Sequence, residues 1–251
     1  MATGAIGTHS FGVDRLNRLA EFEGKHFWFE GRRELLRGML GERLGRPGTV
    51  VLDAGCGTGA FLGELARLGQ DAVGLDRLPE AVALARRSCP QARVELGDVT
   101  ALPFPDASFD GILLLDVLEH VDDRRALGET ARALRTGGFV AVTVPACPRL
   151  WSARDVVAGH RRRYARSELV SRLREAGFSI ERVSYYQFFL FPLFALSRLL
   201  GRRNRAWLER EERVPRGLGR ALGSVSRWEA RLGKHVRWPV GSSLVAVAVK
   251  P

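Results

Sequence analysis

The sequence predicts a single α/β domain built around a mostly parallel β-sheet. Short apolar, β-branched segments alternate along the chain with segments of helical periodicity. Parallel strands need crossover connections, which helices usually supply. At 251 residues the chain is long enough for one sizeable core, and its composition of 45% hydrophobic and 27% charged residues is ordinary for a folded protein.

The expected elements follow one another in a regular order. A helical cap is expected over 14–45, because Gly45 and Pro47 then stop the helix. The expected strands are 49–54, 72–76, 93–96, 111–115, 139–144, 179–186 and 244–249, and the helices between them are 60–68, 79–88, 122–134 and 168–176. About 50 residues separate the last two strands, too many for a hairpin loop. The chain thus divides into the cap (14–45), a core (49–186), a helical insertion (187–240) and a final strand (243–250).

The cysteines and the apolar segments indicate the cellular compartment in which the protein is expected. Cys56, Cys89 and Cys147 are too few and too scattered for a disulfide framework, and they lack metal-ligand spacing, so no metal site is expected. The N-terminus lacks the pattern of a secretory signal, and no stretch of about 18 apolar residues predicts a membrane span. We therefore expect a cytoplasmic protein, with peripheral association at the inner membrane face as an option.

The net charge of +11 is concentrated in the C-terminal part of the chain. Residues 149–237 contain 21 basic and 8 acidic side chains. Such asymmetry favours an anionic partner, such as phospholipid, a phosphorylated substrate or nucleic acid. The alternative is that arginines merely decorate solvated helix faces. No recognisable RNA-binding module is present, so nucleic acid ranks low.

A glycine loop follows the first expected strand, in the segment VLDAGCGTG of residues 51–59. Glycines after a buried strand let a ligand approach the backbone, and the next helix offers free N–H groups. Gly55, Gly57 and Ala60 also fit the dinucleotide fingerprint. The loop alone therefore predicts a nucleotide-like ligand without choosing between candidates.

Two acids discriminate between those ligands. Asp53 precedes Gly55 by two residues, where a carboxylate would repel the pyrophosphate of a dinucleotide. S-adenosylmethionine (SAM) has no phosphate, and its methionyl end carries an ammonium and a sulfonium. Asp76 ends the second expected strand, 21 residues after Gly55, where it can accept both ribose hydroxyls. We therefore expect SAM as the cofactor, and a dehydrogenase is disfavoured.

Across roughly residues 25–185 the chain resembles the class I SAM-dependent methyltransferase family. The resemblance is to its type 11 branch, which includes enzymes similar to ubiquinone-biosynthesis O-methyltransferases. It is carried by VLDAGCGTG and by VGLD, GDV (97–99), FDGILLLDVLEHVDD and LRTGGFVAVTVP. The resemblance implies a Rossmann-like, seven-stranded, mostly parallel sheet with helices on both faces and an antiparallel last strand.

The same resemblance implies a set of cofactor contacts. The SAM-binding residues would be Asp53, Gly55, Cys56, Gly57, Gly59, Asp76, Arg77, Asp98, Val99 and Leu115. The segment HFWFEGRR (26–33) looks like the N-terminal segment that caps the SAM site, where Arg32 or Arg33 would bind the SAM carboxylate. The alternative is that Phe27 and Trp28 only pack this helix on the sheet.

Candidate catalytic residues follow the fourth and fifth expected strands. His120 could act as a general base, although the Glu119–His120 pair is common in the family and part of its role could be structural. The Asn/Asp-Pro-Pro-Tyr/Phe tetrapeptide that serves nitrogen acceptors is absent. His160 is the second catalytic candidate. The expected substrate-binding residues are Trp28, Glu119, Trp151, Arg161 and Tyr164. The alternative for 160–164 is a solvated basic helix start.

The segment QFFLFPLFALSRLL (187–200) is unusually apolar but too short to span a bilayer. With its neighbouring arginines it suggests an interfacial helix or a lid over a lipid-like acceptor, and the alternative is a core helix or a dimer contact. The sequence therefore predicts a methyltransferase acting on an oxygen of a small-molecule, saccharide or lipid-like acceptor. The rivals are an RNA or protein methyltransferase and a catalytically silent SAM-binding, membrane-associated protein. The oligomeric state stays open.

Overall fold

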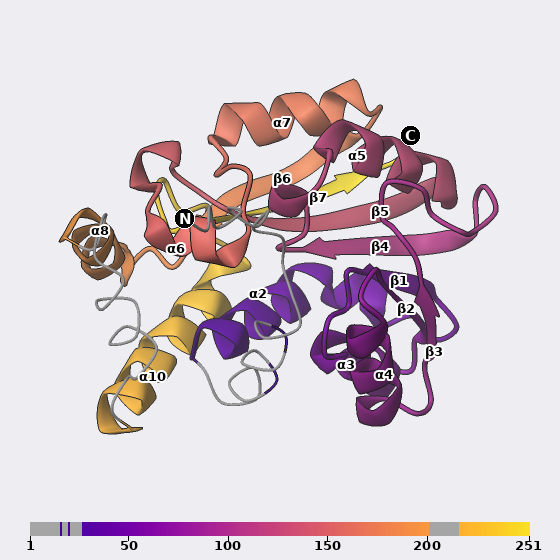
Figure 1. Ribbon diagram of the computed structural model, residues 1–251, viewed down its shortest axis with the longest axis horizontal. Coiled ribbons are helices and arrows are strands. Elements are labelled where there is room, and N and C mark those ends of the chain that lie inside the picture. Colours follow the sequence, from indigo (N-terminus) through magenta and orange to yellow (C-terminus); the bar gives the residue numbers. More distant parts are fainter. Residues whose placement is uncertain (1–15, 17–19, 21–26, 201–215) are drawn as a thin grey trace, which may run out of the picture.

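A computed structural model gives the structure of the chain and describes residues 16, 20, 27–200 and 216–251 (Figure 1). Seven strands form one sheet in the order β3-β2-β1-β4-β5-β7-β6. Their bounds are β1 (Val50–Ala54), β2 (Asp71–Asp76), β3 (Arg93–Leu96), β4 (Phe109–Leu115), β5 (Leu134–Pro145), β6 (Ser179–Tyr186) and β7 (Ser243–Val249). β7 pairs antiparallel with both β5 and β6, whereas the other neighbouring strands are parallel. The predicted fold class is confirmed.

Helices cover both faces of this sheet (Figure 1). The helices are α2 (Phe27–Leu44), α3 (Ala60–Arg67), α4 (Pro79–Ser88), α5 (Asp123–Ala133), α6 (Ala153–Ala158), α7 (Arg166–Glu175), α8 (Phe191–Leu200) and α10 (Arg216–Gly233), with short 3₁₀ turns η1 (Leu118–His120) and η2 (Pro148–Leu150). α5 and α7 lie on one face, and α2, α3, α4 and α10 lie on the other. No helix in this part of the chain is both long and apolar enough to cross a membrane.

The central strands contribute side chains to two apolar cores, one on each face of the sheet. Leu52 packs in the core under α5 and α7, and its neighbour Val51 packs in the core under α2 and α3. Ile112 and Leu113 of β4 divide in the same way. Successive side chains of a strand point to opposite faces, so a strand covered on both sides is apolar throughout. This explains why the expected strands 111–115 and 139–144 are continuous apolar runs.

The helical insertion packs against the helical cap. α8 and α10 both lie between β6 and β7 in the chain, and α10 runs along α2. The two helices approach closely, because a Cβ added at Gly31 of α2 would lie only 2.0 Å from Ser226 Oγ of α10. Arg227 also donates to Glu30 at 2.8 Å. Of the expected cap over 14–45, the structure describes α2 and, before it, only two helical positions, Leu16 and Ala20.

The strand order defines the edge at which a ligand would bind. The chain runs outward from β1 to β2 and β3 on one side and from β4 to β5 on the other. In open α/β sheets, ligands bind beyond the carboxyl ends of the strands where the order reverses. Here that point lies beyond β1 and β4, next to the glycine loop.

Candidate active site

The glycine loop is held against the end of β2. The backbone N–H groups of Gly55 and Cys56 both donate to the carbonyl oxygen of Leu75, at 2.7 and 2.9 Å. Gly57 and Gly59 have φ of +54° and +82°, in the left-handed region that glycine adopts without strain. Cys56 is buried under the loop, and all three cysteines are free thiols. The loop thus turns sharply from β1 into α3.

Asp76 connects this loop to the second strand. Its Oδ2 accepts from the N–H of Gly57 and its Oδ1 accepts from the N–H of Leu78, both at 2.9 Å. Burial raises the pKa of the Asp76 carboxyl, while these hydrogen bonds oppose the shift. Each oxygen retains lone pairs for further donors. Arg77 follows on the exposed side of the strand end.

The other predicted cofactor residues lie at neighbouring strand ends. Asp98, just past β3, accepts from the N–H and the Oγ1 of Thr100, both at 2.7 Å. Partial burial would raise its pKa, but the Thr100 hydrogen bonds and nearby arginine charges outweigh burial and lower it. Val99, after β3, and Leu115, the last residue of β4, are buried, at 7% and 8% exposure. The carboxyl ends of β2, β3 and β4 therefore present all three positions to one edge.

α2 closes the sheet edge over β1 and β4. Arg32 is buried and donates to Asp116, while its guanidinium lies 5.0 Å from the ring centre of Trp28. Asp116 follows β4 with φ of +59°, a conformation that Asp tolerates better than most residues. Asp53 lies deeper, with 2% of its surface exposed. In this structure the predicted carboxylate-binding Arg32 is thus paired with Asp116.

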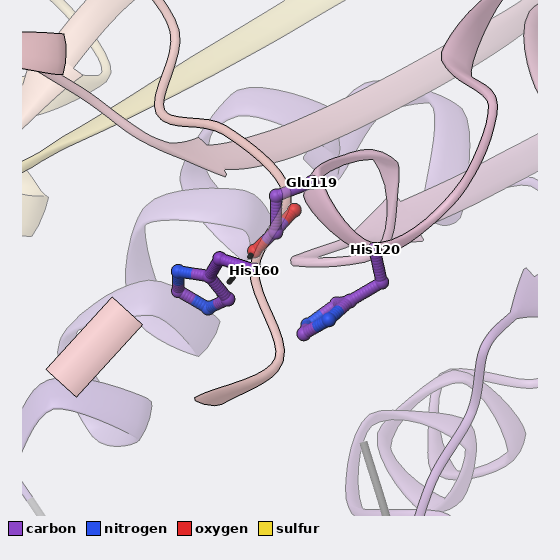
Figure 2. Close-up of side chains that lie close together, drawn as sticks. All are labelled: Glu119, His120 and His160. Atoms are coloured by element: carbon purple, nitrogen blue, oxygen red, sulfur yellow. Dashed lines mark ion pairs between the residues drawn. The ribbon is translucent and has the colours of Figure 1, made fainter. Parts of the chain in front are cut away.

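The loops after β4 and β5 bring Glu119, His120 and His160 together (Figure 2). The N–H of Arg161 donates to the carbonyl oxygen of Glu119 at 2.7 Å, which fixes one loop against the other. The two imidazole rings are 5.0 Å apart, centre to centre. Glu119 is 1% exposed, and burial raises the pKa of its carboxyl, with Asp116 raising it further. Both predicted catalytic histidines therefore face one polar cluster.

Asp155 orients this cluster, and sequence reasoning gave it no role. It accepts from Nδ1 of His160 at 3.0 Å and from Arg163 at 3.1 Å. It also accepts from the N–H of Ser152 at 2.9 Å, as part of a capping box that starts α6. Burial would raise its pKa, but the His160 hydrogen bond and two arginines hold the pKa well below its usual range. The spacing Ser152-x-x-Asp155 is the signal that could have identified this residue.

The predicted substrate residues are found in three different environments. Tyr164 is fully buried, and its hydroxyl lies 2.9 Å from Asp123 Oδ2, so it supports the core beneath η1. Burial raises the pKa of this phenol. Arg161 is exposed, and Trp151 and Trp28 are half-buried. Asp123, which also pairs with Arg162 at 2.9 Å, is a buried acid that sequence reasoning missed.

The protein has a Rossmann-like α/β fold. Its second strand ends in Asp76, which accepts a hydrogen bond from the glycine loop. Comparison with known families agrees, because residues 52–142 match the model of the methyltransferase domain family. A probable SAM-dependent methyltransferase of Mycolicibacterium smegmatis is 33% identical over 160 residues, covering 62% of this chain and 61% of the relative. A demethylmenaquinone methyltransferase of Tropheryma whipplei is 36% identical over 146 residues, covering 56% and 57%.

Solved structures share the whole fold. A geranyl diphosphate methyltransferase in complex with SAM has a TM-score of 0.63 at 16% identity, covering 99% of this chain and 93% of that chain. A SAM-dependent methyltransferase from Thermotoga maritima has a TM-score of 0.59 at 18% identity, covering 94% and 98%. The chain thus matches a methyltransferase domain family over residues 52–142 and shares the fold of solved SAM-dependent methyltransferases. It spans about three fifths of the two relatives described above.

Proposed function

We propose that this chain binds SAM and transfers its methyl group to an oxygen of a small-molecule, saccharide or lipid-like acceptor. The contact between Gly57 and Asp76 carries the proposal, because it sets a carboxylate and a close backbone turn side by side at the switch point. Asp76 would accept the ribose hydroxyls. Asp98 and Val99 would meet the adenine, and Arg77, Cys56 and Leu115 would also contact SAM.

Asp53 favours SAM over a phosphate-bearing cofactor. Its carboxylate is buried at the start of the loop, where a pyrophosphate would have to lie next to it. Like charges at short distance in a buried site repel strongly, whereas an ammonium or a sulfonium is attracted. SAM, when bound, supplies an activated methyl group on such a sulfonium. Arg32 would bind the carboxylate of SAM in place of the carboxylate of Asp116.

The polar groups closest to the acceptor would be His120 and His160. They lie in the loops that follow β4 and β5. Glu119 lies between them, and Trp151 and Arg161 come from the loop that carries His160. We infer that this cluster positions the acceptor oxygen and removes its proton, since methyl transfer needs an aligned and deprotonated oxygen.

Calorimetry should show stoichiometric binding of SAM or S-adenosylhomocysteine and no comparable binding of NAD. Asp76→Ala should weaken binding by roughly 1.5–3 kcal/mol, because charge-assisted hydrogen bonds to the ribose are lost. Asp71→Ala is the matched control, since Asp71 is exposed at the opposite end of the same strand. Tight NAD binding without SAM binding, or unchanged affinity in Asp76→Ala, would contradict the proposal.

A lipid-like or membrane-borne acceptor is supported by the surface around α8. Leu193 and Leu196 are each 54% exposed, and Trp228 of α10 is also 54% exposed. Phe189, at 41% exposure, lies with its ring 5.2 Å from that of Trp228, so these two aromatic side chains adjoin. Other apolar side chains of 187–200 are used in packing, as Leu190 is buried. Exposed apolar patches of this kind mark interaction sites.

The charges expected beside this surface are only partly available to a membrane. Arg198 donates to Ser152 at 2.7 Å and lies 3.6 Å from Asp155, so it serves the site instead. Arg202, Arg203 and Arg205 lie outside the described residues. We propose that the exposed leucines, more than the arginines, mediate contact with an anionic membrane surface.

Co-sedimentation with vesicles tests this contact. The chain should bind phosphatidylcholine–phosphatidylglycerol vesicles, and the double variant Leu193→Ser, Leu196→Ser should bind at least about tenfold more weakly, since burying each leucine is worth about 1.5–3 kcal/mol. The control is Val156→Ser, Val157→Ser, which removes exposed apolar side chains from α6. If the parent protein ignores vesicles of every composition, a compact water-soluble acceptor becomes the better proposal.

A further inference from the structure

An ion pair on α5 contacts the segment that follows β3. This segment, residues 97–106, carries Asp98 and Val99, the two residues that would meet the adenine of SAM. Glu129 and Arg132 lie one turn apart on α5. Two hydrogen bonds join their side chains, from Nε to Oε1 at 3.0 Å and from Nη2 to Oε2 at 2.8 Å. A paired arrangement of this kind fixes the orientation of both side chains.

Leu102 is the point at which the ion pair meets the segment. Its N–H donates to Oε2 of Glu129 at 2.8 Å, and its carbonyl oxygen accepts from Nη2 of Arg132 at 3.1 Å. Both main-chain hydrogen-bonding groups of one residue are therefore bound by side chains of α5. The Leu102 side chain is buried in the same apolar core as Ala126 and Leu127 of α5. Together these contacts fix Leu102 relative to the helix.

The guanidinium of Arg132 also reaches further along the segment. Its Nη1 donates to the carbonyl oxygen of Phe104 at 2.9 Å and to Oδ1 of Asp106 at 2.7 Å. With the two oxygens of Glu129 and the carbonyl of Leu102, five acceptor atoms surround the group. An arginine has five N–H donors, so the set is complete. One side chain thus joins α5 to three residues of the segment.

A tight turn connects Leu102 with the adenine end of the segment. The N–H of Ala101 donates to the carbonyl oxygen of Asp98 at 3.0 Å. The N–H of Thr100 donates to the Asp98 carboxylate at 2.7 Å. Val99 and Asp98 precede Leu102 by only three and four residues. Because the turn is closed by these hydrogen bonds, a displacement of Leu102 would also displace Asp98 and Val99.

The Glu129–Arg132 pair is ionised at neutral pH but is partly open to solvent. Hydrogen bonds from Arg132 lower the pKa of the Glu129 carboxyl, and burial opposes them only in part. The Arg132 and Glu129 side chains are 31% and 25% exposed. Ion pairs in contact with water add little to the free energy of unfolding. The contacts with the segment are therefore a more specific role for this pair than global stability.

We propose that Glu129 and Arg132 are positioning residues for the adenine end of SAM. Their ion pair holds Leu102 and, through the turn at residues 98–101, keeps Asp98 and Val99 where the base would bind. The pair acts on the proposed SAM site, so this role rests on the proposed function. A preformed site binds more tightly than one that must be ordered by its ligand. Breaking the pair should therefore lower affinity without removing a contact with SAM itself.

Calorimetry with S-adenosylhomocysteine measures this effect. Arg132→Gln and Glu129→Ala should each weaken binding by about tenfold, because apparent affinity falls with the fraction of molecules in the binding conformation. The matched control is Arg135→Gln. Arg135 pairs with Asp110 at 2.8 Å and donates to the carbonyl oxygen of Ala107, beyond the segment. This control should bind within about twofold of the parent protein, as expected for an exposed substitution.

A double-variant cycle distinguishes positioning from general destabilisation. If Arg132 acts through Asp98, the loss caused by Arg132→Gln should be at least about twofold smaller in an Asp98→Ala background than in an Asp76→Ala background. General destabilisation would cause the same loss in both backgrounds. Circular dichroism at the temperature of the titration verifies that each variant is folded.

Parental affinity in both Arg132→Gln and Glu129→Ala, or equal losses in the two backgrounds, would overturn the positioning role and leave the proposed function intact. If the parent protein itself binds neither SAM nor S-adenosylhomocysteine, the proposed function fails, and the positioning role fails with it. The parent titration therefore tells the two failures apart before any variant is compared.

Discussion

Asp155→Ala is expected to lower the free energy of unfolding by about 3–5 kcal/mol, because it leaves the guanidinium of Arg163 buried without its counter-charge. The two side chains are 1% and 4% exposed and 3.1 Å apart. The same change removes the capping-box acceptor of α6 and the partner of His160. Urea unfolding followed by circular dichroism would measure the loss.

A double-variant cycle separates charge burial from the other losses. Adding Arg163→Met to Asp155→Ala should recover part of the stability, since replacing both partners of a buried pair costs less than removing one. Glu95→Ala is the control for an ion pair in solvent, because Glu95 and Arg93 are 40% and 62% exposed. It should change stability by less than about 0.5 kcal/mol. Equal effects of Asp155→Ala and Glu95→Ala would contradict a buried supporting network.

Gly59→Ala is expected to cost about 2–5 kcal/mol, well above the cost of Gly57→Ala. Both residues have positive φ, which costs an alanine about 1–2 kcal/mol. At Gly59 the new Cβ would also lie 2.9 Å from the Cα of Ala85, a backbone atom of α4 that cannot rotate away. Overpacking of this kind adds about 1–3 kcal/mol.

Gly57 is the internal control for that comparison. A Cβ added there meets nothing within 4 Å, so only the backbone term remains. Denaturant midpoints of the two variants therefore measure how tightly the start of α3 is packed on α4. If both variants unfold at the same denaturant concentration, the close approach at Ala85 is not maintained in solution. The third glycine of the loop would then serve the ligand and not the packing.

Most of the fold was predictable because buried strands are visible in the sequence as short apolar segments. β3 and β6 begin and end where the apolar pattern places them, at Arg93–Leu96 and Ser179–Tyr186. β5 is longer than expected, because it begins at Leu134 and includes Gly137 and Gly138, which no apolar run marks. The packing of α10 on α2 was not predictable, since it depends on contacts between segments almost 200 residues apart.

The positions of the proposed cofactor residues were easier to predict than the loop contacts around His160. Asp76 is the last residue of β2, so strand order alone places it beside the glycine loop. The contact of His160 with Glu119 depends on how two loops fold back on each other, which no local pattern encodes. Tyr164 shows the same limit, since its polar hydroxyl suggested a ligand contact while Asp123 provides a buried partner for it.

The position of β7 also affects how the protein is made. Translation produces β6 about sixty residues before β7, yet β7 lies between β5 and β6 in the sheet. On the ribosome, β6 therefore has no strand to pair with until Ser243–Val249 leaves the exit tunnel. The carbonyl oxygen of Ser242, just before that strand, accepts from Arg163 at 3.2 Å and from the N–H of Ala146 at 2.9 Å. The loop that carries His160 thus gains its last supporting contacts only late in synthesis, and a nascent chain stalled before Ser242 would lack them.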